Sequence, residues 1–369
     1  MTVRHLIYTL AALIGTPLLA FSPCPDTRAH EKYEDNAPPP RQSYQPPEYS
    51  APQQPTKVKC HEEEPECLPM EVLCDAGPLV CNGADVFFTG SFILWWPSQE
   101  GTEYAMSGIG TNPSKGDTHD VDYGVQPGFK VGLGFFPNHD GWDLYAQYTW
   151  LHASAGDHTT SSNLNPIVAT TTSTISEANA DWSLKFNTLD IELARNFFVS
   201  RYLKMRPFFG IKGTWQDQDY SVNYISENPL FGRRNIRIDQ DYWGVGIRGG
   251  CNTAWHFTNM FSFIGNVAIS ALWSGYDVDR SDIDKFTSLD NTLVHTQNNF
   301  HTVLPVLELL FGLRFETWFH HEEYHLAVDA GWEEQVWWGH NRYVNLTRPQ
   351  QNGGDLVFQG LTLTVRFDF

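Results

Sequence analysis

Four cysteines recur every seven residues in a proline-rich stretch, at Cys60, Cys67, Cys74 and Cys81. A zinc site needs cysteine pairs two to four residues apart, so this spacing argues against one. A coiled-coil seam has the right period, but three prolines between the cysteines interrupt any helix. Disulfide bonds, within the stretch or between chains, suit an oxidising compartment and are the interpretation we favour. Their pairing stays open, as do the roles of Cys24 and Cys251.

Ionic side chains further along the chain alternate with apolar ones. In a β-strand, the ionic side chains would lie together on one face and the apolar side chains on the other. If such strands close into a narrow barrel, opposite charges that meet in its interior, the lumen, form either a salt-bridge network or the lining of an aqueous pore. The predicted lumen-facing residues are Lys130, Asp190, Glu192, Arg206, Lys212, Arg248, Glu308, Arg314, Glu316, Arg366 and Asp368, and Asp329 and Glu333 share their parity.

Catalytic chemistry finds little support. Fourteen histidines in the chain make chance Asp–His neighbours common. The run from His320 to His325 holds metal-ligand types, but it falls on a predicted turn, where solvation explains polar residues. No nucleophile elbow and no phosphate-binding glycine loop is present. We therefore expect no enzyme activity, no catalytic residue, no metal site and no cofactor.

Composition narrows the class of protein. The chain has 369 residues and a net charge of −19, which disfavours nucleic acid as a partner. Aromatic residues are 14% and charged residues 18%, below the usual charged fraction of about 25%. Residues 1–22 are predicted to be a signal peptide, with a basic start, an apolar run and small residues near Ser22. An N-terminal anchor helix and lipoprotein processing at Cys24 are weaker alternatives.

Residues 23–83 form a predicted arm with 12 of the 22 prolines, too many for helix or central strand. From residue 84 to Phe369, ten segments alternate with period two. They are residues 84–96, 122–136, 142–155, 180–199, 204–224, 236–257, 260–281, 299–319, 324–338 and 355–369. Short connections alternate with long ones, as in a bacterial outer-membrane barrel with short periplasmic turns and long external loops.

Two arrangements of the alternating faces compete. A large soluble barrel would bury its apolar face, whereas a membrane barrel turns that face outward to lipid. The export signal, the sorted connections and the small residues on the non-apolar face favour the membrane barrel. We therefore expect the apolar side chains from Val86 onward to face hydrocarbon and the ionic ones to line the lumen. Most of the 13 tryptophans lie near segment ends, where two interfacial girdles are expected.

Several motifs then suggest a family. They are Asp85–Trp96 followed by Glu103-Tyr104-Ala105, Gly128–Gly134, Asn187–Glu192, Arg206–Gly210, Gly331–Trp337 and Leu361–Phe369. Across residues 84–369 the chain resembles the Legionella-type pore-forming outer-membrane proteins, and it shares features with the chlamydial major-outer-membrane-protein-like porins. The resemblance implies diffusion of small hydrophilic solutes. It also implies an assembly signal at Phe367 and Phe369, and cysteine cross-linking of the envelope through the arm.

The sequence thus predicts an all-β transmembrane antiparallel barrel of about ten strands, preceded by a largely disordered periplasmic Pro/Cys arm. The predicted location is the bacterial outer membrane, reached by export through the periplasm. The predicted function is a passive pore, and the alternative is a structural or adhesive barrel with an occluded lumen. Expected partners are the lipid bilayer, the barrel assembly machinery, and disulfide-linked envelope proteins or a second copy of the chain.

Overall fold

A computed structural model describes residues 85–108, 116–137, 141–169, 175–227, 232–286, 289–321, 323–343 and 354–369. All of them belong to Lys59–Phe369, the second of the two units into which the chain divides. The predicted signal peptide and the Pro/Cys arm lie outside the described residues. None of the described residues forms a helix with the length and apolarity needed to cross a membrane.

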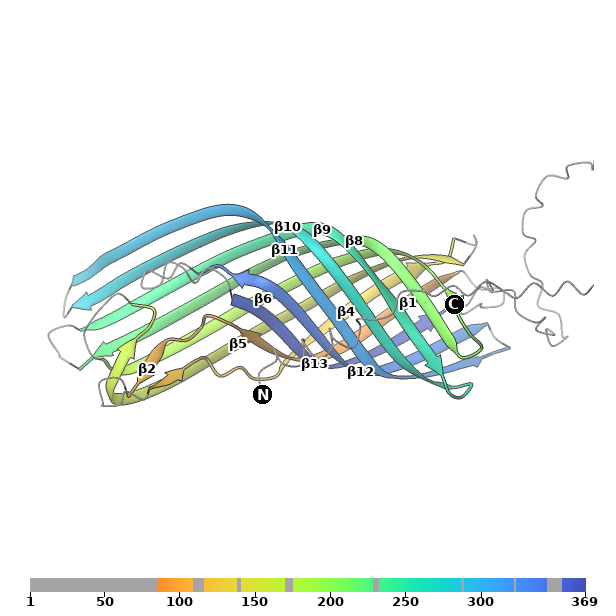
Figure 1. Ribbon diagram of the computed structural model, residues 1–369, viewed down its shortest axis with the longest axis horizontal. Coiled ribbons are helices and arrows are strands. Elements are labelled where there is room, and N and C mark those ends of the chain that lie inside the picture. The colour runs from red at the N-terminus through yellow and green to blue at the C-terminus, as the bar shows by residue number, and fades with distance from the viewer. Residues whose placement is uncertain are drawn as a thin grey trace, which may run out of the picture. The chain divides into compact units, whose positions relative to one another are not determined.

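The described chain is one 13-stranded antiparallel sheet closed into a barrel (Figure 1). Three short strands are accessory: β2 (Ala105–Ser107), β3 (Asp117–His119) and β7 (Phe197–Phe198). The other ten form the wall: β1 (Val86–Gln99), β4 (Gln126–Phe135), β5 (Trp142–Pro166), β6 (Ile175–Arg195), β8 (Leu203–Ser226), β9 (Arg233–His256), β10 (Phe261–Phe286), β11 (Leu289–Phe319), β12 (Tyr324–Asn341) and β13 (Gly354–Asp368). These ten confirm the predicted segments and the predicted closed antiparallel fold.

Wall strands run in the order β5-β4-β1-β13-β12-β11-β10-β9-β8-β6, and β5 pairs with β6 to close the ring. The last strand pairs with the first, from Phe87 opposite Asp368 to Gln99 opposite Leu356. Short connections at one end of the barrel join β4 to β5, β6 to β8, β9 to β10 and β11 to β12. We call this end the turn end. The opposite end is the loop end.

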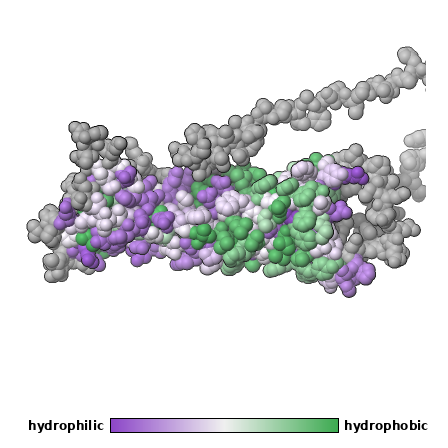
Figure 2. Space-filling model, turned by 90° about the horizontal axis from the view of Figure 1, so that it is seen from below, coloured by the Kyte–Doolittle hydropathy of each residue, from purple (hydrophilic) through white to green (hydrophobic). Residues whose placement is uncertain are grey.

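Apolar side chains cover the outside of the wall near the turn end. On β4, Phe129, Val131, Leu133 and Phe135 are exposed, while the alternate Gly128, Lys130, Gly132 and Gly134 face inward and are buried. On β9, Ile247 is 74% exposed. Figure 2 shows hydrophobic residues gathered in a band toward one end of the barrel, with hydrophilic residues over the other end. A band of exposed apolar residues around a closed barrel is the surface that faces lipid.

The strands are longer at the loop end than the sequence suggested. β10 and β11 stay paired as far as Phe286 and Leu289, so most of the predicted connection 281–298 is strand. Similarly, β5 reaches Pro166 and β6 begins at Ile175 within the predicted connection 156–179. Side chains on these extensions keep the period of two but lose their apolar outer face. The wall therefore continues well beyond the apolar band.

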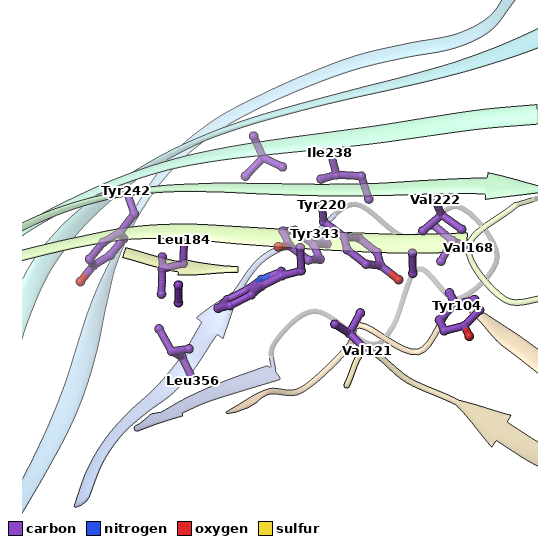
Figure 3. Close-up of a cluster of buried hydrophobic side chains, with 14 of the residues drawn as sticks. Tyr104, Val121, Val168, Leu184, Tyr220, Val222, Ile238, Tyr242, Tyr343 and Leu356 are labelled. Carbon is purple, nitrogen blue, oxygen red and sulfur yellow. The ribbon is translucent and has the colours of Figure 1, made fainter. Parts of the chain in front are cut away.

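Inside the loop-end half, the barrel is filled largely by a hydrophobic cluster, with buried polar side chains such as Gln218, Gln240 and Arg280 among it. Strand residues such as Tyr220, Val222 and Ile238 pack there with Tyr104 and Val121 from the connection after β1 (Figure 3). The expectation that apolar side chains all face lipid is therefore wrong for this half. Trp95, Trp182 and Trp337 are fully buried inside the barrel and do not belong to an interfacial girdle. Above the band, water replaces lipid outside, so the apolar face turns inward as in a soluble barrel.

Candidate functional site

An ionic network occupies the interior of the turn-end half. Lys212 sits at its centre with Nζ 2.8 Å from a carboxylate oxygen of Asp190 and 2.8 Å from one of Glu308. Arg248 bridges Glu308, at 2.7 Å, and Glu192. These side chains project from β6, β8, β9 and β11, so the network ties together wall strands that are not all neighbours.

Arg206 extends the same network toward the turn end. Its guanidinium donates to Glu192 at 3.0 Å and holds Asp143 of β5 with two nitrogens, one at 2.5 Å. The Asn196 side-chain amide also donates to Asp143, at 2.6 Å. Asp143 was absent from the sequence prediction. It shares the inward parity of Thr149 and Leu151 on β5, and that parity was the signal that could have identified it.

Further ion pairs line the wall close to the turn end. Arg314 on β11 pairs with Asp329 on β12 at 2.7 Å, and Arg366 pairs with Asp368 on β13 at 2.6 Å. His325 lies 2.7 Å from Asp368 and 3.6 Å from Glu316. The interpretation of the His320–His325 run as a solvated turn is therefore wrong for His325, whose side chain is buried and ion-paired. The described residues contain no group of His, Cys, Asp and Glu side chains suited to a metal ion.

Lys130 on β4 reaches Glu333 on β12, with Nζ 2.6 Å from a carboxylate oxygen. Thr362 and Gln335 donate to the same carboxylate at 2.8 and 2.9 Å. Lys130 also lies 4.8 Å from the ring centroid of Trp95, which is cation–π geometry. The structure thus places every predicted lumen-facing residue on the inner wall, and each one is ion-paired. Whether they line a conducting pore stays a prediction.

An aromatic layer crosses the barrel just above these charges. Phe186 on β6 contacts Trp337 on β12 with ring centroids 5.4 Å apart, and Phe358 on β13 at 4.8 Å. Trp95 on β1 packs against Phe358 at 5.6 Å. Four wall strands separate β6 from β12 in either direction, so Phe186 and Trp337 meet across the full width of the barrel. We call Phe186, Trp337, Phe358 and Trp95 the aromatic layer.

Connecting segments fold into the barrel above the aromatic layer and fill it. Tyr343, which follows β12, stacks on Tyr220 with ring centroids 5.4 Å apart. The Tyr220 hydroxyl donates to the carbonyl of Thr102 at 2.7 Å, and Arg280 donates to the carbonyl of Val168 at 2.7 Å. Backbone groups of the connections are therefore bonded to wall side chains. We call these inserted segments the loop plug.

Below the aromatic layer, the turn-end half retains a polar cavity of about 200 Å³. Side chains of Lys130, Arg206, Arg248 and Glu308 lie on its walls, together with Lys204, which was also absent from the sequence prediction. Lys204 has the same parity as Arg206 and Lys212 on β8, so alternation alone could have placed it inside. The cavity and the loop plug lie on opposite sides of the aromatic layer.

Carboxylates also gather outside the barrel, beyond the apolar band. The pairing register sets two rows of three aspartates side by side on the outer faces of β8, β9 and β10: Asp217, Asp241 and Asp277, then Asp219, Asp239 and Asp279. The Arg237 guanidinium partly neutralises the negative charge of the second row, because its nitrogens lie 2.9 Å from carboxylate oxygens of both Asp219 and Asp239. Burial and Coulomb repulsion from Asp217 and Asp277 raise the pKa of Asp241 above its ordinary value.

We predict that Asp241→Asn stabilises the barrel at pH 7. The pKa of the Asp241 carboxyl is higher in the folded state than its unfolded value of 3.8. Its ionisation therefore disfavours folding at pH values above the folded-state pKa, and this penalty is absent below pH 3.8. Because these groups are well solvated, the gain should stay below about 1 kcal/mol. Urea midpoints at pH 7 and pH 3 test this, with a gain expected only at pH 7. Asn299→Asp, opposite Asp277, should lower the pH 7 midpoint; a midpoint unmoved in both variants would contradict the repulsion.

Comparison with known protein families identifies the family to which this chain belongs. The model of a family described as the Legionella pneumophila major outer membrane protein precursor matches residues 80–369. No curated protein matches the chain.

Solved structures similar to this chain include Ail, the attachment invasion locus protein of Yersinia pestis, at 9% identity and TM-score 0.22, covering 76% of this chain and 97% of that one. The translocator domain of autotransporter NalP from Neisseria meningitidis is 10% identical with TM-score 0.29, covering 78% and 90%. The P. putida toluene transporter TodX is 8% identical with TM-score 0.29, covering 79% and 91%.

These scores are too low to carry an argument, so the fold rests on the strand pairing and the family on the sequence match. The predicted likeness to the Legionella-type proteins is confirmed, whereas the likeness to chlamydial porins stays a prediction. The turn end is accordingly periplasmic and the loop end extracellular. The chain belongs to the family of the Legionella pneumophila major outer membrane protein and is a β-barrel of the bacterial outer membrane.

Proposed function

We propose that the protein is a closed outer-membrane barrel with a structural or adhesive role at the cell surface. The observation that carries this proposal is the aromatic layer, because Phe186 and Trp337 meet from opposite walls and leave no aqueous path between them. A barrel of about eight strands is just filled by its side chains, and ten strands lie close to that limit. The ion pairs in the interior then stabilise the barrel by linking its strands to one another.

A second candidate is passive diffusion of small hydrophilic solutes, which the sequence resemblance implies. The polar cavity of about 200 Å³ supports it, because a solute would find ionic walls on the periplasmic side of the aromatic layer. Passage requires a conformation in which the aromatic layer parts and the loop plug leaves the barrel. Selectivity would then come from the ion-paired residues around Lys212 and Arg248.

Planar-bilayer recording of the refolded full chain separates the two candidates. The closed barrel predicts a silent bilayer at protein concentrations where a known porin inserts and conducts. Heat-dependent gel mobility of the same sample would show that the barrel is folded. Discrete conductance steps from folded wild-type protein would overturn the closed barrel and favour the pore.

The cysteines carry a separate proposal, since Cys60, Cys67, Cys74 and Cys81 lie outside the described residues. We expect them to link the arm to a second copy or to other envelope proteins through disulfides. Non-reducing gels of outer membranes should show oligomers that a reductant dissolves and that disappear when all four become serine. Monomers with and without reductant would contradict the cross-link.

A further inference from the structure

The periplasmic cavity carries an excess of positive charge in a strongly acidic protein. Ten ionic side chains line it, of which six are cationic: Lys130, Lys204, Arg206, Arg248, Arg314 and Arg366. The carboxylates on the same walls are Glu192, Glu308, Asp329 and Glu333. The lining is therefore net positive, although the chain as a whole has a net charge of −19.

Lys204 accounts for one of the two excess positive charges, and it is the cation that no carboxylate offsets. The other five cations each have a carboxylate partner within 3.0 Å in the described structure. Among the described residues, the Lys204 side chain has neither an ion-pair partner nor a hydrogen-bond acceptor, although it is partly buried on the inner wall. An ammonium group that is drawn out of bulk water without a partner is costly unless something else solvates it.

The charges around Lys204 increase that cost. The guanidiniums of Arg366 and Arg314 line the same cavity as Lys204, and the carboxylates that act on it are those of Glu316 and Asp368. Both carboxylates are already engaged, Glu316 by His256 at 2.8 Å and Asp368 by His325 and Arg366. No described carboxylate is left over to neutralise the ammonium group.

We propose that Lys204 binds a small monovalent anion, either chloride or a small carboxylate, inside this cavity. Asn252 also lines the cavity and can donate its side-chain amide. It lies on β9 two residues from Ala254, the register partner of Lys204, which places it on the same face within reach of the lysine. The volume of about 200 Å³ admits an acetate-sized ligand with its hydration water. The proposal holds whether or not the aromatic layer ever opens.

Chloride-35 NMR of the refolded full chain in zwitterionic detergent tests the site. Chloride exchanging with a protein site broadens the bulk resonance. The wild type should broaden the line more than Lys204→Met, and acetate should remove that excess. Lys185→Met is the matched control, because Lys185 is exposed on the outer wall and paired with Asp217, so its broadening should equal that of the wild type. Equal broadening by wild type and Lys204→Met would overturn the proposal.

A second variant keeps the test decisive if Lys204→Met does not fold. Asn252→Asp places a carboxylate beside the ammonium with almost no change in volume, so it should abolish the acetate-sensitive broadening. Lys204→Arg, which keeps the charge, should retain it. Acetate-sensitive broadening that survives in folded Asn252→Asp would show that the anion binds elsewhere. Conductance of the wild type bears only on the closed barrel, so the two proposals fail separately.

Discussion

Replacing Phe186 and Trp337 together with alanine should turn a silent barrel into one with brief, discrete ion-conducting openings. The two rings meet across the barrel from β6 and β12, and the loop plug rests on the cluster to which they belong. Removing both takes away the packed rings between the periplasmic cavity and the loop plug, and it deprives the plug of its packing. Each truncation of a buried aromatic residue should also cost about 3–5 kcal/mol of stability.

Single-channel recording in planar bilayers measures this result. The matched control replaces Phe209 and Trp243 with alanine, because these aromatic residues are 60% and 47% exposed on the outer wall and face lipid. That variant should stay as silent as the wild type. If the Phe186/Trp337 variant is folded by heat-dependent gel mobility but still silent, the aromatic layer is not what closes the lumen.

Lys212→Met should destabilise the barrel by about 3–5 kcal/mol, because it removes one partner from a buried ionic network. The Lys212 side chain is only 2% exposed, and its loss leaves Asp190 and Glu308 to share Arg248. Urea unfolding of the refolded protein in lipid vesicles, followed by tryptophan fluorescence, gives the change in free energy.

Two variants make the Lys212 measurement specific. Lys185→Met breaks a solvent-exposed pair 3.6 Å from Asp217 and should cost about 0–1 kcal/mol. Adding Glu308→Gln to Lys212→Met removes one of the unpaired carboxylates and should restore part of the loss. An effect of Lys212→Met no larger than that of Lys185→Met would show that the interior charges contribute nothing to stability.

The wall of the barrel was predictable because lipid and lumen impose opposite preferences on successive residues. Phe129, Val131 and Leu133 alternate with Gly128, Lys130 and Gly132, and that contrast fixes both the strand and its faces. The same rule assigned the ionic residues of β8, β11 and β13 to the interior. Lys204 and Asp143 follow the same rule, because each shares the inward parity of its strand close to the turn end.

The aromatic layer and the loop plug were not predictable in the same way. Period two separates two faces but does not say where the membrane ends, so an apolar residue above the band has the same pattern as one within it. Trp95 and Trp96 show the ambiguity, because adjacent strand residues face opposite sides and one of the two must point inward. The filling of the loop-end half depends on Tyr104, Val121 and Tyr343, which come from connecting segments without periodicity.

Pairing of the last strand with the first has a consequence for biogenesis. The seam joins residues such as Ser91 and Thr364, whose side chains bond at 2.8 Å although 273 positions separate them. Contacts between such distant parts of a chain form slowly, because a very long segment must first be ordered. Until β13 is available to pair with them, β1 and β12 both present unpaired edges that invite aggregation. A nascent chain of this protein must therefore be held unfolded until β13 has been made, and any truncation before Gly354 removes the strand that closes the barrel.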